Sequence, residues 1–335
     1  KLNLLISGTV EFLSIVVVNN TLKSDVFQQA ISRISGENIF FVGDECHRHA
    51  TDLTISILPE CSYRIGLSAT PFVDTQGATL DAIDVQDQKT EKELLTSYYG
   101  NVVADYSLIE ALADGVLTPY KYYIVPVYLT EMERESYKEL SKQIAQFFQM
   151  DSSKNNTALS NAIRKRNKII QNCQNKDLAL SKVLNDYAFE NKKHTLFYVG
   201  EGSANGDYDD AETVSQLQKM ATVISDKGWS VSKFTAQESG TDRKKIMADF
   251  TSGAIESLLS MRVLDEGIDI PACKRAFILA SSSNPRQFIQ RRGRILRRYP
   301  GKEFAEIFDF VVLPQHGSDD KPFENLVRKE LSRVM

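Results

Sequence analysis

Short apolar runs alternate with helix-like segments in two parts of the chain, and this alternation constrains the fold more than any other feature. In the first part, β-rich apolar runs occupy residues 15–18, 39–42 and 64–67, with a helical pattern at residues 25–34. Strands that alternate with helices are joined by crossover connections, so the strands are parallel and helices cover the sheet. The first part therefore predicts a parallel α/β domain.

The second part repeats the pattern with more strands. Its strand-like runs are residues 195–199, 230–234, 257–261, 276–280 and 306–312. Its intervening helical segments are residues 212–225, 243–250 and 286–296. We therefore predict an α/β fold with two parallel sheets, and we expect residues 39–42 and 195–199 to lie in different sheets.

The region between the two patterns differs from both. Residues 120–129 have the pattern of an extended segment that crosses from one sheet to the other, and two long polar helical patterns follow at residues 131–148 and 158–192. Residues 150–156 and 200–210 are rich in loop-forming residues. The predicted domains are residues 1–125, a helical connecting segment at 126–192, a second domain at 193–313, and the start of a C-terminal helical region at 314–335.

Composition excludes some classes of protein. The 335 residues suffice for two domains, and 42% hydrophobic with 25% charged residues is typical of globular proteins. No apolar run has the length of a membrane span. The net charge of -4 gives no overall basic character, so nucleic acid would have to bind in a local groove. The four scattered cysteines favour a reduced, cytoplasmic protein. The chain opens at Lys1 without a signal peptide and stops inside a helical pattern, so both ends are expected to be cut.

Two carboxylates, Asp44 and Glu45, directly follow an apolar strand in the sequence Asp-Glu-Cys-His. Ligands of open α/β sheets bind beyond the carboxyl ends of the strands. An Asp in this place can hold Mg²⁺ through water, and a neighbouring Glu can take a proton from an attacking water. A solvated acidic turn explains this motif, taken alone, equally well.

Two further motifs also follow strands. In the first, the hydroxyl residues Ser68 and Thr70 precede Pro71, and their small side chains would let a carboxylate approach. In the second, Gly267 permits a tight loop and Asp269 could accept a hydrogen bond from a ribose. Ordinary turn chemistry accounts for either motif by itself.

An arginine-rich helix is the most informative motif. Asn284 suits the N-cap and Pro285 the first helical position. At about 100° per residue, one face is predicted to gather Phe288, Ile289, Ile295 and Leu296. The opposite face is predicted to gather Gln290, Arg294 and Arg297. Two guanidinium groups on one rigid helix suit bidentate contacts to a polyphosphate. A solvated basic helix would gain nothing from Gly293, which costs roughly 1 kcal/mol against Ala.

The order of these motifs resembles superfamily 2 helicases. The sequences DECH, SATP, VLDEGIDIP and QRRGRILR are similar to motifs II, III, V and VI of that family, and the resemblance covers nearly the whole chain. It implies two RecA-like domains with ATP in the cleft between them, the first incomplete at its N-terminus. The segment from Tyr106 to Tyr120 looks like the branch that contains the motor subunits of type I and type III restriction enzymes.

The resemblance also implies a role for each matching residue. In the nucleotide site, Asp44 would position Mg²⁺, Glu45 would activate water, Gly267 and Asp269 would line the cleft, and Arg294 and Arg297 would stabilise the transferred phosphoryl group. For coupling, His47 and Gln290 would connect the domains, and Ser68 and Thr70 would link nucleotide state to nucleic-acid contact. For the nucleic-acid backbone, the matching positions are Asn20, Thr21, Thr235 and Arg262.

One motif of the family does not occur. No sequence of the form G-x-x-x-x-G-K-[ST], which cradles nucleotide phosphates, precedes Asp44. Either the sequence is a fragment that begins after this loop, which we expect, or the protein is a degenerate motor that cannot hydrolyse ATP. The present fragment would then be inactive alone.

The function implied is an ATP- and Mg²⁺-dependent nucleic-acid helicase or translocase. It would act on DNA rather than RNA, in restriction, defence or repair, with no membrane partner and with a nuclease or specificity subunit or fused domain. One alternative is a catalytically inactive scaffold derived from a motor. The other is a zinc-binding or nuclease module with Cys46, His47, His49 and Cys61 as ligands, although their spacing matches no common zinc pattern.

Overall fold

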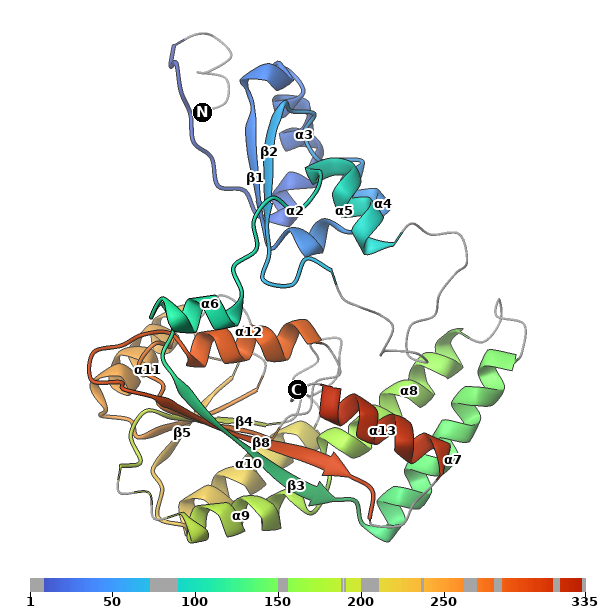
Figure 1. The fold of residues 1–335 in the computed structure, drawn as a ribbon, viewed down its shortest axis with the longest axis vertical. Coiled ribbons are helices and arrows are strands. Elements are labelled where there is room, and N and C mark those ends of the chain that lie inside the picture. The colour runs from blue at the N-terminus through green and yellow to red at the C-terminus, as the bar shows by residue number, and fades with distance from the viewer. Residues whose placement is uncertain are drawn as a thin grey trace. The chain divides into compact units, whose positions relative to one another are not determined.

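The computed structural model describes residues 9–72, 90–149, 156–187, 189, 191–199, 211–235, 238–261, 270–279, 285–315 and 320–332. The chain divides into two compact units, Lys1–Asp105 and Tyr106–Met335, which are drawn in Figure 1 and are described one at a time.

The first unit contains a two-stranded parallel sheet. Strand β1 (Phe40–Asp44) pairs with β2 (Tyr63–Leu67), so that Gly43 lies beside Gly66 and Asp44 beside Leu67. The described helices of this unit are α2 (Asn19–Leu22), α3 (Asp25–Ile31), η1 (Gly36–Asn38), η2 (Cys46–His49), α4 (Asp52–Ile55) and α5 (Glu91–Tyr99). Serine and threonine hydroxyls cap three of them, and Thr90 with Glu93 forms a full capping box at α5. The predicted strands at residues 39–42 and 64–67 and the helix at 25–34 are therefore confirmed.

The predicted strand at residues 15–18 is wrong. These residues adopt no regular structure, and the side chains of Val16 and Val18 are 98% and 67% exposed. A run of β-branched residues favours an extended backbone, but a strand also needs a partner edge for its hydrogen bonds and a neighbour that buries its side chains. Neither β1 nor β2 supplies them.

The second unit contains a six-stranded sheet in the order β3-β8-β7-β4-β6-β5, in which every neighbouring pair is parallel. The strands are β3 (Tyr120–Tyr128), β4 (Thr195–Tyr198), β5 (Val231–Phe234), β6 (Ser257–Ser260), β7 (Arg275–Ile278) and β8 (Ala305–Leu313). All five strands predicted for this sheet are confirmed. Residues 120–129 are extended as predicted, but they do not cross between sheets, because β3 pairs with β8 along its whole length.

Helices cover both faces of this sheet, as its fully buried central strands β4 and β6 require. On one face, Phe197 and Phe277 pack with residues of α9 (Lys176–Asp186), α10 (Ala211–Asp226) and α13 (Lys321–Ser332). On the other face, Leu196 and Ile278 pack with residues of α11 (Gly240–Ser252) and α12 (Pro285–Ile295). The predicted α/β architecture with two separate parallel sheets is therefore confirmed.

A row of aromatic rings crosses four strands of the sheet. Tyr123 of β3 stacks on Phe308 of β8 with ring centroids 4.6 Å apart, Phe308 on Phe277 at 4.9 Å, and Phe277 on Phe197 at 4.7 Å. These separations are close to the spacing of neighbouring strands, because the rings occupy paired positions of the register. Such cross-strand pairs fix the register of the sheet.

Helices α6 (Leu108–Ala113), α7 (Glu131–Gln149) and α8 (Asn156–Gln171) complete the second unit. The predicted single helix at residues 158–192 is wrong, because α8 ends at Gln171 and α9 begins at Lys176. The intervening residues include two asparagines, which are poor helix formers, and the buried Lys176 ammonium binds the last carbonyls of α8, Ile170 and Gln171.

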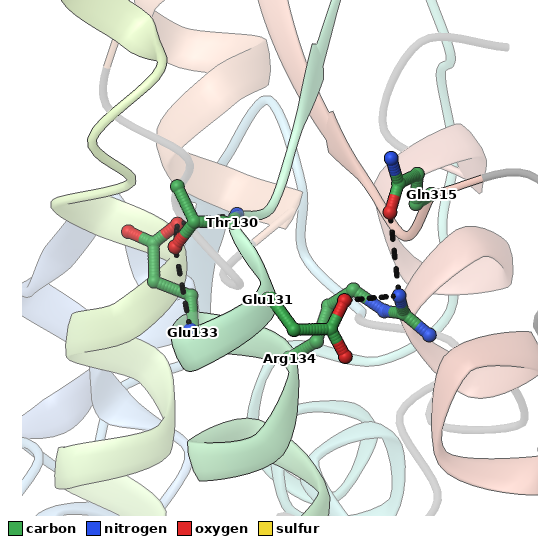
Figure 2. A network of polar contacts seen from close by, with 5 residues as sticks. All are labelled: Thr130, Glu131, Glu133, Arg134 and Gln315. Carbon is green, nitrogen blue, oxygen red and sulfur yellow. Dashed lines mark hydrogen bonds and ion pairs between the residues drawn. The ribbon is translucent and has the colours of Figure 1, made fainter.

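The start of α7 is fixed by side-chain hydrogen bonds (Figure 2). The Glu133 carboxylate accepts from the backbone nitrogen of Thr130 at 2.8 Å and from its hydroxyl at 2.9 Å. Arg134 donates to Glu131 at 2.9 Å and to Gln315 at 3.4 Å, which joins α7 to the segment after β8. None of the helices in the described part of the chain combines the length and apolar character needed to cross a bilayer.

Candidate nucleotide site residues in each unit

The acidic motif and the Ser-Ala-Thr motif meet at one edge of the first sheet. Asp44 is the last residue of β1, and Ser68 directly follows β2. Because the strands are parallel and Asp44 pairs with Leu67, both motifs leave the sheet at its carboxyl end, where ligands of α/β sheets bind. The exposed Asp44 carboxylate suits a Mg²⁺ ion that keeps several waters and is otherwise bound by phosphates.

Glu45 has an unusual backbone conformation for a residue with a side chain. Its φ of 49° and ψ of 48° lie in the left-handed region. Its amide donates to the Asp44 carboxylate at 3.0 Å, which holds the turn. Such a conformation costs a non-glycine residue on the order of 1 kcal/mol and is found most often at functional sites.

His47 connects the two motifs directly. Its ring nitrogen Nδ1 lies 3.0 Å from the Ser68 hydroxyl and 3.3 Å from the Glu45 carboxylate. Ser68 in turn accepts a hydrogen bond from the backbone nitrogen of Thr70 at 3.1 Å. An unprotonated Nδ1 accepts from Ser68, whereas a protonated Nδ1 donates to Glu45. The state of Glu45 is thereby linked through His47 to the loop that follows β2.

A second histidine of the same loop, His49, was assigned from the sequence only to the alternative zinc site. It is buried, its Nδ1 accepts from the Tyr99 hydroxyl at 2.7 Å, and its Nε2 donates to the Asn19 side chain at 3.3 Å. Asn19 begins α2, which carries the exposed residues Asn20 and Thr21. Hydrogen bonds therefore connect the acidic loop to the helix that bears two of the predicted nucleic-acid contacts.

Burial lowers the pKa of His49 below its ordinary value of 6.5, and the positive charge of Lys23 adds to this effect. His49 therefore binds a proton at a higher pH in the unfolded chain than in the folded unit. The free energy of unfolding should be at its full value above pH 6.5 and should decrease as the pH falls toward the lowered pKa. Amide exchange of β1 measured between pH 5 and 8 should show this loss. His49→Gln should flatten the profile, and His194→Gln, in the second unit, should leave it unchanged.

Two paired glycines explain how the site loop is packed. A Cβ atom at Gly43 would lie 2.1 Å from the Tyr99 hydroxyl, and one at Gly66 would lie 3.0 Å from the Cys46 sulfur. The Tyr99 ring therefore fills the place that side chains would take on this face of the sheet. Glycine at these positions lets α5 approach closely and places the Tyr99 hydroxyl against His49.

Gly43→Ala should consequently destabilise the first unit by about 1–3 kcal/mol, since the added methyl group overpacks this contact. Native-state amide exchange of β1 would measure the loss. Gly240→Ala, where a Cβ atom meets open space, is the control and should change stability little. The loss in Gly43→Ala should shrink when Tyr99→Phe is added, and simple additivity of the two changes would contradict the packing explanation.

The alternative zinc site is not supported. Among the described residues, no group of three or more His, Cys, Asp or Glu side chains could hold a metal ion, and all four proposed ligands are described. Cys61 instead contacts the Tyr98 hydroxyl at 3.5 Å, and His49 is held by Tyr99 and Asn19.

In the second unit, α12 begins at Pro285 as predicted, but its buried face differs from the prediction. Ile295 and Leu296 are fully buried, whereas Ile289 is 39% exposed and Arg291 is 1% exposed. The Arg291 guanidinium lies 5.3 Å from the centre of the Tyr198 ring of β4, a cation–π contact that a charge-based reading of the helix could not reveal. Arg292 donates to the Tyr122 hydroxyl at 2.8 Å, and Tyr122 donates to the buried Asp309 at 2.5 Å.

Gln290 and Arg294 are partly exposed residues of α12, and Arg297 is an exposed residue just beyond its end. As predicted, these three residues do not lie in the core that contains Ile295. Thr235 is buried at the end of β5 and is capped by Glu238, whose carboxylate accepts from its backbone nitrogen at 2.6 Å. Arg262, Gly267, Asp269 and Asn284 lie outside the described residues.

The predicted loop at 200–210 also lies outside the described residues, and so does the predicted loop at 150–156 apart from residue 156. Residue 156 begins α8. The prediction that Asp44 and Glu45 face Arg294 and Arg297 concerns the placement of one unit against the other, and it stays a prediction.

Comparison with known proteins identifies part of the second unit. Residues 207–299, which contain α10, α11 and α12, match the family model described as "Helicase conserved C-terminal domain". The chain therefore carries a superfamily 2 helicase C-terminal domain. The arginine helix α12 lies within this helicase domain, at its C-terminal end.

Individual relatives agree with this identification. The chain is 26% identical over 276 residues to "DNA 3'-5' translocase XPB2" of Sulfurisphaera tokodaii, an alignment that covers 76% of this chain and 55% of the relative. It is 47% identical over 49 residues to "Dicer-like protein 2" of Pyricularia oryzae, which covers 15% of this chain and 3% of that protein. The chain thus spans about half of the first relative's length and much less of the second's.

The fold resembles that of the "ATP-dependent Type ISP restriction-modification enzyme LlaBIII bound to DNA". The TM-score is 0.55 at 17% identity, with 92% of this chain and 21% of that chain covered. At this identity the likeness concerns the fold alone. It supports the α/β architecture with parallel sheets.

Proposed function

We propose that the chain is the motor part of an ATP-dependent translocase or helicase that acts on DNA. The contact that carries this proposal is His47 with Ser68 and Glu45, because it joins the DECH and SATP motifs at the carboxyl edge of one sheet. A solvated acidic turn would require no such link. The helicase C-terminal domain, which contributes α12, supports the same conclusion.

In the proposed reaction, Asp44 holds the water shell of Mg²⁺ and Glu45 accepts a proton from the attacking water. Mg²⁺, when held through Asp44, would neutralise negative charge on the phosphates. Arg294 and Arg297 stabilise charge on the transferred phosphoryl group, and Gly267, Asp269 and Gln290 contribute further to nucleotide binding. His47, Ser68 and Thr70 couple the nucleotide state to Asn20, Thr21 and Arg262, which contact the nucleic-acid backbone. Thr235, which is buried and bonded to Glu238, is not included among these contacts.

The preference for DNA rests on two relatives. The Sulfurisphaera tokodaii protein is named a DNA translocase, and the restriction-modification enzyme of similar fold is described as bound to DNA. We further propose a role in restriction, defence or repair, with a nuclease or specificity partner or fused domain. Because the net charge of the chain is -4, DNA would have to bind to a local surface and not through an overall positive charge.

Nucleic-acid-stimulated ATP hydrolysis tests the proposal. The full-length protein should release phosphate faster with duplex DNA than without nucleic acid, and RNA of equal length should stimulate it less. Residues 1–335 alone should show no turnover, since they contain no G-x-x-x-x-G-K-[ST] loop. A full-length protein that binds DNA but never hydrolyses ATP would instead establish the inactive scaffold.

A further inference from the structure

The ammonium group of Lys302 is buried between two segments of the helicase C-terminal domain. Lys302 lies in the turn between α12 and β8, and its side chain is 8% exposed. Its Nζ donates to the carbonyl oxygens of Ile295, Arg297 (3.0 Å) and Pro271 (3.2 Å). An ammonium has three donors and no acceptor, so these three carbonyls satisfy it completely.

The three carbonyls belong to two different parts of the proposed nucleotide site. Ile295 ends α12, and the last carbonyls of a helix have no partner within it, so Lys302 caps the arginine helix. Pro271 ends the DEGIDIP motif that contains Gly267 and Asp269. Its neighbours Ile270 and Cys273 are buried and joined by a 3.0 Å backbone hydrogen bond, so this end of the motif is firmly anchored.

The backbone at Arg297 has a second attachment. The Thr118 hydroxyl donates to the Arg297 carbonyl at 3.3 Å, and the Thr118 amide donates to the Leu296 carbonyl at 2.7 Å. Thr118 follows α6, which is drawn beside α12 in Figure 1. Of the two side chains that bind the Arg297 carbonyl, Thr118 and Lys302, the Lys302 side chain is the one that also donates to Pro271.

We propose that Lys302 is a positioning residue for ATP turnover, which sets the backbone of Arg297 relative to the DEGIDIP motif. This inference rests on the proposed function, because it assumes that Arg297 acts on the nucleotide. The ammonium of Lys302 is bound to backbone carbonyls, so Lys302 would act through Arg297. It holds two segments in one geometry, and a misplacement of about 1 Å can cost on the order of 100-fold in rate.

A matched control exists in the same unit. Lys176 is 3% exposed, and its Nζ also donates to three backbone carbonyls, those of Ile170 (2.8 Å), Gln171 (3.0 Å) and Leu279 (2.6 Å). It touches neither α12 nor Pro271 through these bonds. Lys176→Met therefore removes another buried ammonium that donates to three backbone carbonyls and serves as the comparison for Lys302→Met.

The test compares full-length wild type, Lys302→Met, Lys302→Arg and Lys176→Met. Lys302→Met should lower kcat for ATP hydrolysis by about 10- to 100-fold, while KM for ATP changes by less than about threefold. Lys302→Arg should restore part of kcat, and Lys176→Met should lower thermal stability without lowering kcat. An equal fall of kcat in Lys302→Met and Lys176→Met, or an unchanged kcat in Lys302→Met, would overturn the proposal.

A second readout does not depend on activity. The amides of Leu296 and Cys273 are both hydrogen bonded, and both should exchange on the order of tenfold faster in Lys302→Met but not in Lys176→Met. A response at only one of them would show that Lys302 does not couple the segments.

If wild type hydrolyses no ATP, the proposed function fails, and amide exchange still decides whether Lys302 couples the two segments. If Lys302→Met does not fold, Lys302→Gln, a shorter and neutral donor, replaces it, with a smaller fall in kcat expected. An unchanged kcat together with unchanged exchange at Leu296 and Cys273 in that variant would overturn the proposal.

Discussion

Replacement of Glu45 by Gln should reduce ATP hydrolysis by the full-length protein by about 10²–10⁴-fold, the usual contribution of a general base. Gln keeps the shape and the hydrogen-bonding reach of Glu45 but cannot accept a proton. The side chain is 41% exposed, so its replacement should cost little stability. ATP binding, measured by equilibrium titration, should survive, because Asp44 is unchanged.

The experiment is steady-state phosphate release with and without duplex DNA. Glu60→Gln, which changes an exposed carboxylate of the same unit, is the matched control and should retain wild-type rates. Equal rates for wild type and Glu45→Gln would remove Glu45 as the base. If Glu45→Gln lost ATP binding together with hydrolysis, the residue would be a ligand of the nucleotide or its metal instead.

Periodicity predicted most of the fold because the strands of the large sheet are apolar on both faces. Strands such as β4 and β8 are buried almost completely, so their composition alone distinguishes them from their surroundings. Residues 15–18 have the same composition without a partner strand, and there the prediction was wrong. A strand is defined by its neighbours as well as by its own residues.

Site residues could be predicted from the sequence where their motif directly follows a strand. They could not be predicted where contacts with residues distant in sequence determine what the side chain does. Asp44 and Ser68 could be placed because each directly follows a β-rich run. Arg291 could not, since its burial depends on the Tyr198 ring, distant in sequence. Lys302 gives no sequence signal either, because its three partners are backbone carbonyls.

The second large effect should come from Arg297→Ala, for which we expect about 10³–10⁵-fold slower ATP hydrolysis, the range known for arginines that stabilise phosphoryl transfer. Its exposed side chain lies just beyond α12, while its backbone is held by Thr118 and Lys302. Truncation of the side chain leaves these backbone contacts in place, so the fold should persist. The loss should appear in kcat more than in KM for ATP, because the charge that Arg297 stabilises develops in the transition state.

Arg298→Ala is the matched control, since it removes the same charge from the neighbouring exposed position. A general effect of positive charge on ATP attraction would slow both variants and would weaken at high salt. A specific role predicts that only Arg297→Ala is slow, at every salt concentration. Equal losses in the two variants would rule out Arg297 as the residue that stabilises the phosphoryl group.

The double variant Glu45→Gln, Arg297→Ala joins the two predictions. The two residues belong to different compact units, so their effects on stability should simply add. Their effects on ATP hydrolysis should not, if both act on the same chemical step, because groups that act together lose most of their benefit when either one is removed. We therefore expect the double variant to be scarcely slower than the worse single variant. A rate reduced by the product of the two single losses would indicate that the units act independently of each other.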